Sequence, residues 1–133
     1  MILQKIQLGQ IGEEAAVSFL ERQGYKIVEQ NFRNTLGEID IIAYDGDTIC
    51  FIEVKTRNSD IFGSPFDSVP VAKQRKIARV ALSYLKFKGK YDEKARFDVI
   101  AVFVCGDSCQ NVEIIKNAFE TYWSRWLFSK ISS

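Results

Sequence analysis

Three charged residues interrupt two apolar segments of the chain, and their types could support metal-ion chemistry. The segments GEIDIIAY (37–44) and TICFIEVK (48–55) surround the sequence DGD and are typical of a β-hairpin. They contain Asp40, Glu53 and Lys55. Because charges buried without partners are costly, these residues indicate either a paired structural charge cluster or a functional site.

The periodicity of a strand predicts how the three side chains lie relative to one another. Successive side chains point to opposite faces, so Glu53 and Lys55 share a face. If Gly46 and Asp47 form a two-residue turn, Asp40 lies directly opposite Glu53; a turn one residue earlier makes the two diagonal on the same face. Only a loop with an odd number of residues would place them on opposite faces.

Two carboxylates on one face of a hairpin favour a divalent cation. At a separation of about 5 Å they repel, so at least one should be protonated unless a cation lies between them. Mg²⁺ prefers such oxygen ligands. A neighbouring lysine could neutralise a developing negative charge or accept a proton from water. The competing interpretation is a cross-strand salt bridge, although the apolar residues on both faces of the hairpin indicate a covered sheet.

Two further polar residues border apolar stripes of predicted helices. Glu13 lies three residues before Ala16, at the border of a buried face, and Gln74 lies three residues before Ile77. Each could point toward the hairpin, or each could be a hydrogen-bonded residue at the edge of the core. Five polar residues that converge on one place would indicate a site more strongly than any one alone.

Composition restricts the chemistry that is open to the protein. The chain has 133 residues, 47% of them hydrophobic, which predicts a globular fold. It has no histidine, so histidine-based triads and metal sites are excluded. The sequence has no apolar run long enough for a membrane span and no signal-peptide pattern, so we expect a cytoplasmic protein with no membrane partner.

Charge is unevenly distributed along a chain whose net charge is only +1. Between positions 73 and 96 only Asp92 and Glu93 oppose nine basic residues. These are Lys73, Arg75, Lys76, Arg79, Lys86, Lys88, Lys90, Lys94 and Arg96. A basic flank beside an acidic centre suits a polyanion held next to a metal, with Lys73, Arg75 and Arg79 as candidate substrate contacts. The alternative is an ordinary solvated helix face.

The predicted elements give the order αβββαββα. We expect helices at 10–24, 70–88 and 118–128, and strands at 25–32, 37–44, 48–55, 95–104 and 111–116. The strand–helix–strand succession around 70–88 predicts a parallel crossover within a mixed sheet. We expect a domain at 1–119 that an aromatic helix at 120–133 extends, and a long loop at 57–69 is a candidate functional loop.

The ordered set of residues resembles the PD-(D/E)xK nuclease superfamily. The closer resemblance is to the YraN-like family, uncharacterised bacterial endonuclease-like proteins related to archaeal Holliday-junction resolvases. The stretches that carry it, within residues 9–104, are GQIGEEAA, GYKIVEQNFR, GEIDIIAYDGDTICFIEVKTR, FGSP, VAKQRKI and RFDVIAV. The chain departs from the pattern at Ile39, where the superfamily has its proline, and at Pro70, where many relatives have Thr or Ser. The resemblance implies an α/β, restriction-endonuclease-like mixed β-sheet flanked by helices.

The resemblance also implies roles for individual residues. Asp40 and Glu53 would hold Mg²⁺, or alternatively Mn²⁺, with the Val54 carbonyl and Glu13 assisting. Lys55 would orient or activate the attacking water.

The remaining implied roles concern the substrate. Gln74 would position Lys55 or a phosphate, and Arg33 would contact the nucleic-acid backbone. The implied activity is that of a metal-dependent endodeoxyribonuclease that hydrolyses phosphodiester bonds of nucleic acid, with DNA and branched or junction structures as expected substrates and a homodimer as the expected assembly. The alternative functions are a catalytically silent nucleic-acid-binding module on a nuclease fold, and a plain interaction domain.

Overall fold

The computed structural model describes residues 5–58, 69–105 and 109–120 of the chain. Its elements in chain order are α1 (Lys5–Arg22), β1 (Lys26–Asn34), β2 (Gly37–Asp45), β3 (Thr48–Asn58), α2 (Val71–Phe87), β4 (Lys94–Cys105) and β5 (Cys109–Phe119). The first helix begins several residues earlier than expected. Residues 118 and 119, expected to begin the C-terminal helix, belong to β5 instead. The part of that predicted helix beyond residue 120 and most of the predicted functional loop lie outside the described residues.

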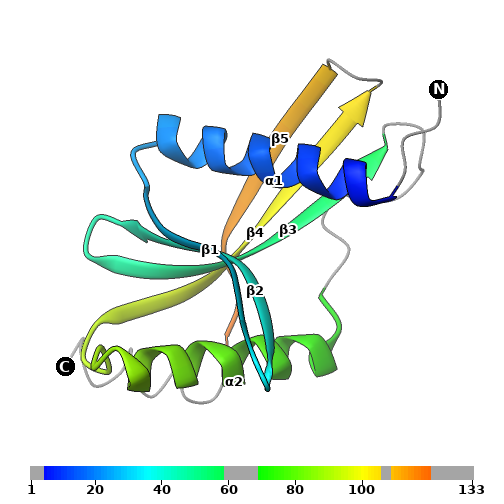
Figure 1. The fold of residues 1–133 in the computed structure, drawn as a ribbon. Coiled ribbons are helices and arrows are strands. Elements are labelled where there is room, and N and C mark those ends of the chain that lie inside the picture. Colours follow the sequence, from blue (N-terminus) through cyan, green and yellow to red (C-terminus); the bar gives the residue numbers. More distant parts are fainter. Residues whose placement is uncertain (1–4, 59–68, 106–108, 121–133) are drawn as a thin grey trace.

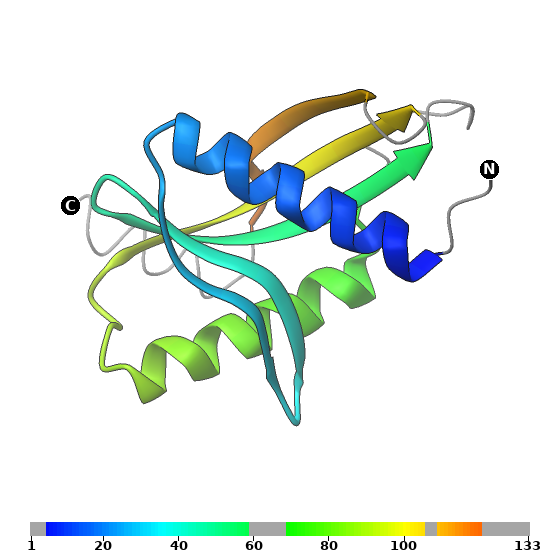
Figure 2. The same ribbon diagram turned by 45° about the horizontal axis from the view of Figure 1, so that its top comes forward.

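The five strands form one mixed sheet with the order β1-β2-β3-β4-β5. All neighbouring strands are antiparallel except β3 and β4, which are parallel and are connected through α2. Helix α1 covers one face of the sheet and α2 the other, as Figures 1 and 2 show. The predicted parallel crossover and the mixed α/β class are confirmed, and the architecture matches the restriction-endonuclease-like fold that the resemblance implies.

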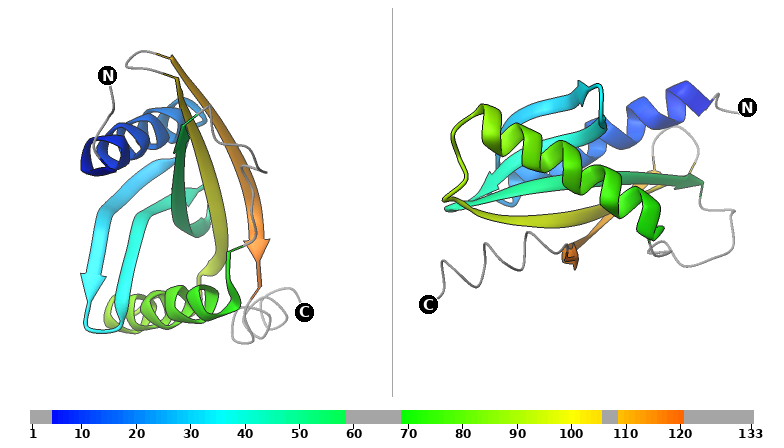
Figure 3. Two further views of the ribbon diagram at one scale, coloured as in Figure 1. Left: turned by 90° about the vertical axis from the view of Figure 1, so that its right-hand side faces the viewer. Right: turned by 90° about the horizontal axis from the view of Figure 1, so that it is seen from below.

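Both faces of the sheet are buried, which explains why its central strands are apolar at consecutive positions. Along β3, Cys50 and Ile52 belong to the core under α1, whereas Ile49 and Phe51 belong to the core under α2. All four are at most 1% exposed. The left view of Figure 3 shows the sheet between the two helices. A sheet covered on both faces leaves a charged side chain on β2 or β3 little access to water except near the strand ends.

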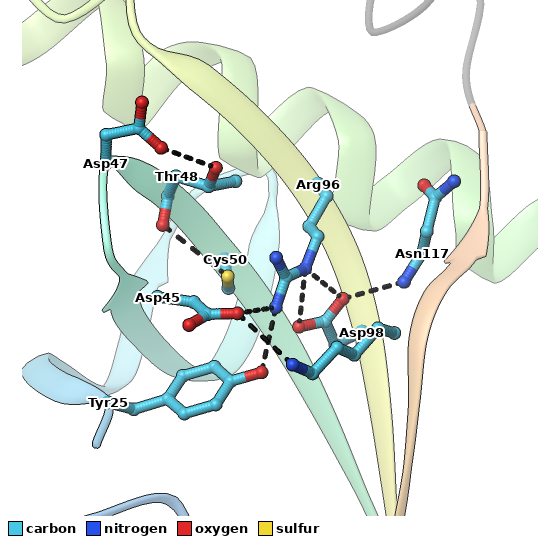
Figure 4. A network of polar contacts seen from close by, with 9 residues as sticks. Tyr25, Asp45, Asp47, Thr48, Cys50, Arg96, Asp98 and Asn117 are labelled. Carbon is cyan, nitrogen blue, oxygen red and sulfur yellow. Dashed lines mark hydrogen bonds and ion pairs between the residues drawn. The ribbon is translucent and has the colours of Figure 1, made fainter. Parts of the chain in front are cut away.

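Charged groups near the closed end of the β2–β3 hairpin neutralise one another. Asp98 is fully buried and accepts hydrogen bonds from Arg96 Nε at 3.0 and 3.1 Å and from the Asn117 backbone N–H at 2.8 Å. The Arg96 Nη2 atom also donates to Asp45 at 2.7 Å and to the Tyr25 hydroxyl at 2.8 Å (Figure 4). This network ties β2, β4 and β5 together, and the Arg96 contact lowers the pKa of Asp45. Within the described residues, each charge of this network has a partner, as a structural cluster should.

Helix α1 approaches β3 closely where it has a glycine. A Cβ atom on Gly12 would lie 1.8 Å from Thr56 Oγ1 and 2.8 Å from Thr56 Cβ. Only a residue without a side chain allows this approach. The contact fixes the axial position of α1 over the end of β3 and brings the neighbouring Glu13 to the same end of the sheet. Neither helix in the described part of the chain is long and apolar enough to cross a membrane.

We predict that Gly12→Ala destabilises the protein. The added methyl group cannot fit against Thr56, so α1 must move away from β3, at a cost of about 1–3 kcal/mol. Gly9→Ala is the matched control, because nothing lies within 4 Å of a Cβ at that position of the same helix. It should be neutral or stabilising by up to about 1 kcal/mol through helix propensity. Chemical denaturation of both variants measures the difference, and equal stability of the two would contradict the close approach.

Candidate metal and nucleic-acid site

The candidate site begins where the β2–β3 ladder ends. The ladder pairs Asp45 with Thr48 and runs as far as Ile41 and Ile52. The loop is therefore Gly46–Asp47, and the first of the two predicted registers is confirmed.

Continued by one step, this register places Asp40 opposite Glu53. At this position a side chain replaces the backbone acceptor of the ladder: the Oδ2 atom of Asp40 accepts a hydrogen bond from the Val54 N–H at 2.8 Å. The end of the hairpin is thus held by a carboxylate.

The backbone of β1 is also irregular beside this carboxylate. The register that pairs Gln30 with Ile41 and Phe32 with Ile39 places Asn31 opposite Asp40. Asn31 has a φ of 53°, a left-handed conformation that asparagine tolerates better than most residues. Asp40 therefore lies at a position where the strands on both sides depart from regular pairing.

The tip of the β1–β2 hairpin forms one wall of the site and is docked on α2. The Asn34 side chain accepts from the Leu36 N–H at 2.9 Å and donates to Ser83 Oγ of α2 at 2.9 Å. Gly37 has a φ of 152°, and a Cβ there would lie 3.2 Å from Val80 Cγ2. A larger residue would therefore push the tip away from α2.

An open cleft of about 540 Å³ lies between this hairpin tip and α2. It is lined by residues 33–38 of the hairpin, by Asp40 and Glu53, and by Lys73, Lys76 and Ile77 of α2. Two predicted metal ligands, Asp40 and Glu53, therefore share one cleft with two predicted substrate contacts, Arg33 and Lys73. The carboxylates lie on the same side of the sheet, as a shared metal requires.

The two carboxylates differ in how they are neutralised. Glu53 is 10% exposed and forms an ion pair with Lys73 at 2.5 Å. The pKa of Asp40 is raised to about 7, first by burial of the carboxyl group and second by repulsion from Glu53. Glu13 and Glu38 add smaller repulsions, while the Val54 hydrogen bond acts in the opposite direction. Asp40 therefore lies in a place that favours either a proton or a cation.

Three other predicted residues are not among those that line the cleft. Glu13 is half-buried on α1 and close enough to Asp40 to repel it. Gln74 lies in the first turn of α2, where its side-chain nitrogen donates to the Val69 carbonyl at 2.8 Å, so part of its hydrogen bonding stabilises the start of the helix. Lys55 is half-buried on β3, two residues beyond Glu53.

Of the predicted substrate contacts, only some lie in the cleft. Arg33 forms an ion pair with Glu38 at 3.2 Å on the cleft wall. Arg75 and Arg79 are exposed on α2, outside the cleft lining that the structure describes.

Sequence reasoning did not identify two residues that shape the cleft, Lys76 and Asn34. Lys76 follows Lys73 by three residues, and this spacing could have placed both on one face of the helix. Asn34 precedes a two-residue turn that a glycine follows, and an asparagine in this position often bonds to its own turn, but nothing local indicates its bond to Ser83.

The donor set fits a hard divalent cation with few protein ligands. In the described residues no group of three or more acidic, cysteine or histidine side chains is arranged to hold a metal. Mg²⁺ commonly binds one or two carboxylates and completes its shell with water and phosphate oxygens. Asp40 and Glu53, with the adjacent Val54 carbonyl, provide such a set, and burial together with repulsion from Glu53, which raise the pKa of Asp40, favour a cation beside it.

The fold and the cleft define an α/β protein of the restriction-endonuclease-like class, with an acidic pair at the open end of its central hairpin. The chain belongs to the uncharacterised protein family UPF0102, the YraN family, whose model matches residues 12–102. A UPF0102 protein of Syntrophus aciditrophicus is 48% identical over 92% of this chain and 95% of its own length. One of Geobacter metallireducens is 50% identical over 90% of this chain and 98% of its own.

We predict that Asp40→Asn stabilises the metal-free protein at high pH. The folded-state pKa of Asp40, about 7, lies above its ordinary value of 3.8, so the folded protein binds the proton more tightly than the unfolded chain. The contribution of Asp40 to the stability of the wild type therefore falls as pH rises through this interval, and it is constant above it. The amide keeps an acceptor for the Val54 N–H without the charge. It should add about 1–3 kcal/mol at pH 8 and nothing near pH 4.

Denaturation in EDTA across this pH range measures the effect. Glu38→Gln is the matched control, because Glu38 lies in the same cleft with 40% of its side chain exposed. Its change should stay within about 0.5 kcal/mol at every pH. An Asp40→Asn protein that is no more stable than wild type at pH 8 would exclude a repelled, desolvated carboxylate.

Proposed function

We propose that the protein is a Mg²⁺-dependent endonuclease that hydrolyses phosphodiester bonds of nucleic acid. The observation that carries this proposal is the acidic pair Asp40–Glu53 at the floor of a cleft whose rim is cationic. An enzyme that cuts nucleic acid needs both features together, since phosphates must be attracted to a place that also holds a metal. The family assignment supports the proposal only broadly, because the relatives' names state no activity.

The acidic pair would bind the metal in this mechanism. Asp40 and Glu53 would each contribute a carboxylate oxygen, the Val54 carbonyl a third ligand, and Glu13 would assist from α1. When bound, the ion would polarise the phosphate and lower the pKa of a coordinated water. The hydrogen bond from Val54 to Asp40 Oδ2 would fix the orientation of that carboxylate before the metal arrives.

Lys55 would act on the attacking water or on the phosphate. It follows Glu53 by two residues along β3, so it lies on the same face of the strand, at the open end of the hairpin. As an ammonium it can orient the water or stabilise the negative charge of the transition state, and as a neutral amine it can accept a proton from the water. Gln74, at the start of α2, would position Lys55 or a substrate phosphate.

The cationic rim would bind the backbone of the substrate. Arg33 on the hairpin tip and Lys73 and Lys76 on α2 line the same cleft, so a strand bound there would meet positive charge from both elements. Arg75 and Arg79 would add longer-range attraction from the exposed face of α2. DNA, including branched or junction forms, is the proposed substrate, and a homodimer the proposed assembly, both from the resemblance to junction-cutting proteins.

We predict that Lys55→Ala abolishes metal-dependent cleavage. The assay uses end-labelled single-stranded, duplex, flap and four-way-junction DNA with Mg²⁺, with Mn²⁺ or with EDTA. The wild type should cut at least one substrate only with metal, and the variant should be slower by about 100-fold or more. Its affinity for DNA should change only modestly, because one phosphate contact of several is lost.

Lys94→Ala is the matched control for charge and for contaminating nucleases. Lys94 begins β4 and forms an ion pair with Asp47 at 3.3 Å, at the opposite end of the β2–β3 hairpin from the cleft. This variant should cleave like the wild type. Cuts that survive in Lys55→Ala would refute the proposed site. Binding without cleavage, steeply weakened by salt, would favour the silent binding module.

A further inference from the structure

We propose that Lys73 is a displaceable counter-cation of the acidic pair, released from Glu53 by metal and then available to a substrate phosphate. The inference rests on the proposed function for the identity of the metal and the phosphate. It concerns a residue that belongs to neither the carboxylate pair nor the lysine of strand β3. It assigns to Lys73 a coupling between metal binding and nucleic-acid binding.

The ion pair itself places a cation where a metal ligand must act. The distance from Lys73 Nζ to Glu53 Oε1 is 2.5 Å, so the two groups are in direct charge-assisted contact. Glu53 is a proposed metal ligand, and an oxygen that a lysine ammonium contacts this closely is less available to a second cation. Metal and Lys73 therefore compete for the same carboxylate.

Lys73 and Glu53 differ in how easily each side chain can move out of the ion pair. Glu53 is fixed in the sheet and only 10% exposed, whereas 52% of the Lys73 side chain is exposed. Lys73 comes from the first turn of α2 and has a four-carbon stem, so its ammonium can exchange Glu53 for water or for phosphate without movement of the backbone.

The other charges of the cleft are arranged differently. Arg33 is paired with Glu38 on the opposite wall, and the Asp40 Oδ2 atom accepts from a backbone N–H. Lys76 lines the same cleft one helical turn beyond Lys73. Of the ion pairs described in the cleft, the one between Lys73 and Glu53 is the pair that joins a rim cation to a floor carboxylate.

Thermodynamic linkage gives the consequence. A phosphate that binds Lys73 leaves Glu53 without its counter-charge and so raises the affinity for metal. Metal must then raise the affinity for nucleic acid by the same factor. Lys73 would thus keep metal affinity low until substrate is present.

The first test measures Mn²⁺ binding to the metal-free protein by calorimetry, with no nucleic acid present. Lys73→Gln should bind Mn²⁺ about 3–10-fold more tightly than wild type, because Glu53 loses its competing partner. Lys76→Gln removes the same charge from the same cleft and controls for general repulsion of cations. Its gain should be smaller, at most about twofold at moderate salt.

Lys73→Arg provides a variant that retains the charge. A guanidinium group can hold the Glu53 carboxylate at least as well as an ammonium, so Mn²⁺ affinity should stay at or below the wild-type value. Equal Mn²⁺ affinities of Lys73→Gln and Lys76→Gln would overturn the proposal. So would a Lys73→Gln protein that binds Mn²⁺ no better than wild type.

The second test measures the coupling through fluorescence anisotropy of a labelled single-stranded DNA 20-mer at constant ionic strength. Ca²⁺ is the cation, since it takes the same oxygen ligands, and a gel confirms that the probe stays intact. Ca²⁺ should strengthen binding severalfold in wild type and Lys76→Gln but much less in Lys73→Gln. Equal enhancement in wild type and Lys73→Gln would overturn the coupling.

The two tests separate this inference from the proposed function. The Mn²⁺ comparison needs no nucleic acid. If the wild type binds no DNA while Lys73→Gln still binds Mn²⁺ more tightly than Lys76→Gln, the nuclease proposal fails and the counter-cation is supported. If DNA binds and is cut but the Mn²⁺ affinities do not differ, the nuclease proposal stands and the counter-cation is excluded.

Discussion

Repulsion between two half-desolvated carboxylates is the constraint on which the rest of the structure depends. Asp40 and Glu53 lie at the open end of the β2–β3 hairpin, where the backbone ladder stops and a side-chain hydrogen bond to Val54 replaces it. Burial and the neighbouring Glu53 raise the pKa of Asp40. A folded protein keeps such a pair at a cost in stability unless a cation offsets the repulsion.

A second charged cluster in the same sheet, around Asp98 and Arg96, has its charges fully compensated by partners. Asp98 is completely buried, yet it accepts two hydrogen bonds from Arg96 and one from the backbone of Asn117. That network joins three strands and needs nothing from outside the chain. Among the described contacts of the acidic pair near the other end of the hairpin, Lys73 bonds to Glu53 and the Val54 N–H bonds to Asp40. This difference in compensation separates a structural charge cluster from a candidate site within one sheet.

The surrounding elements hold the two carboxylates in an accessible cleft. Asn34 ties the β1–β2 hairpin tip to Ser83 of α2, and Gly37 lets the tip approach Val80. On the opposite face, Gly12 allows α1 to lie against Thr56, which brings Glu13 toward the end of the sheet. Because side chains on both faces are packed, opening at this end is what gives solvent and ligands access to charges on the central strands.

The sequence by itself determined the strand order of the hairpin, the face that Glu53 and Lys55 share, and the mixed α/β class. It could do so because side chains alternate strictly in a strand and because DGD and the helical stripes mark the ends of elements. Only the tertiary structure decided between the two registers of the hairpin, in which the two-residue turn differs in position by one residue. It also decided that Lys73 reaches Glu53 while Gln74 bonds to Val69. Periodicity fixes directions within one element, whereas the rotation and height of a helix over a sheet depend on packing between elements distant in the chain.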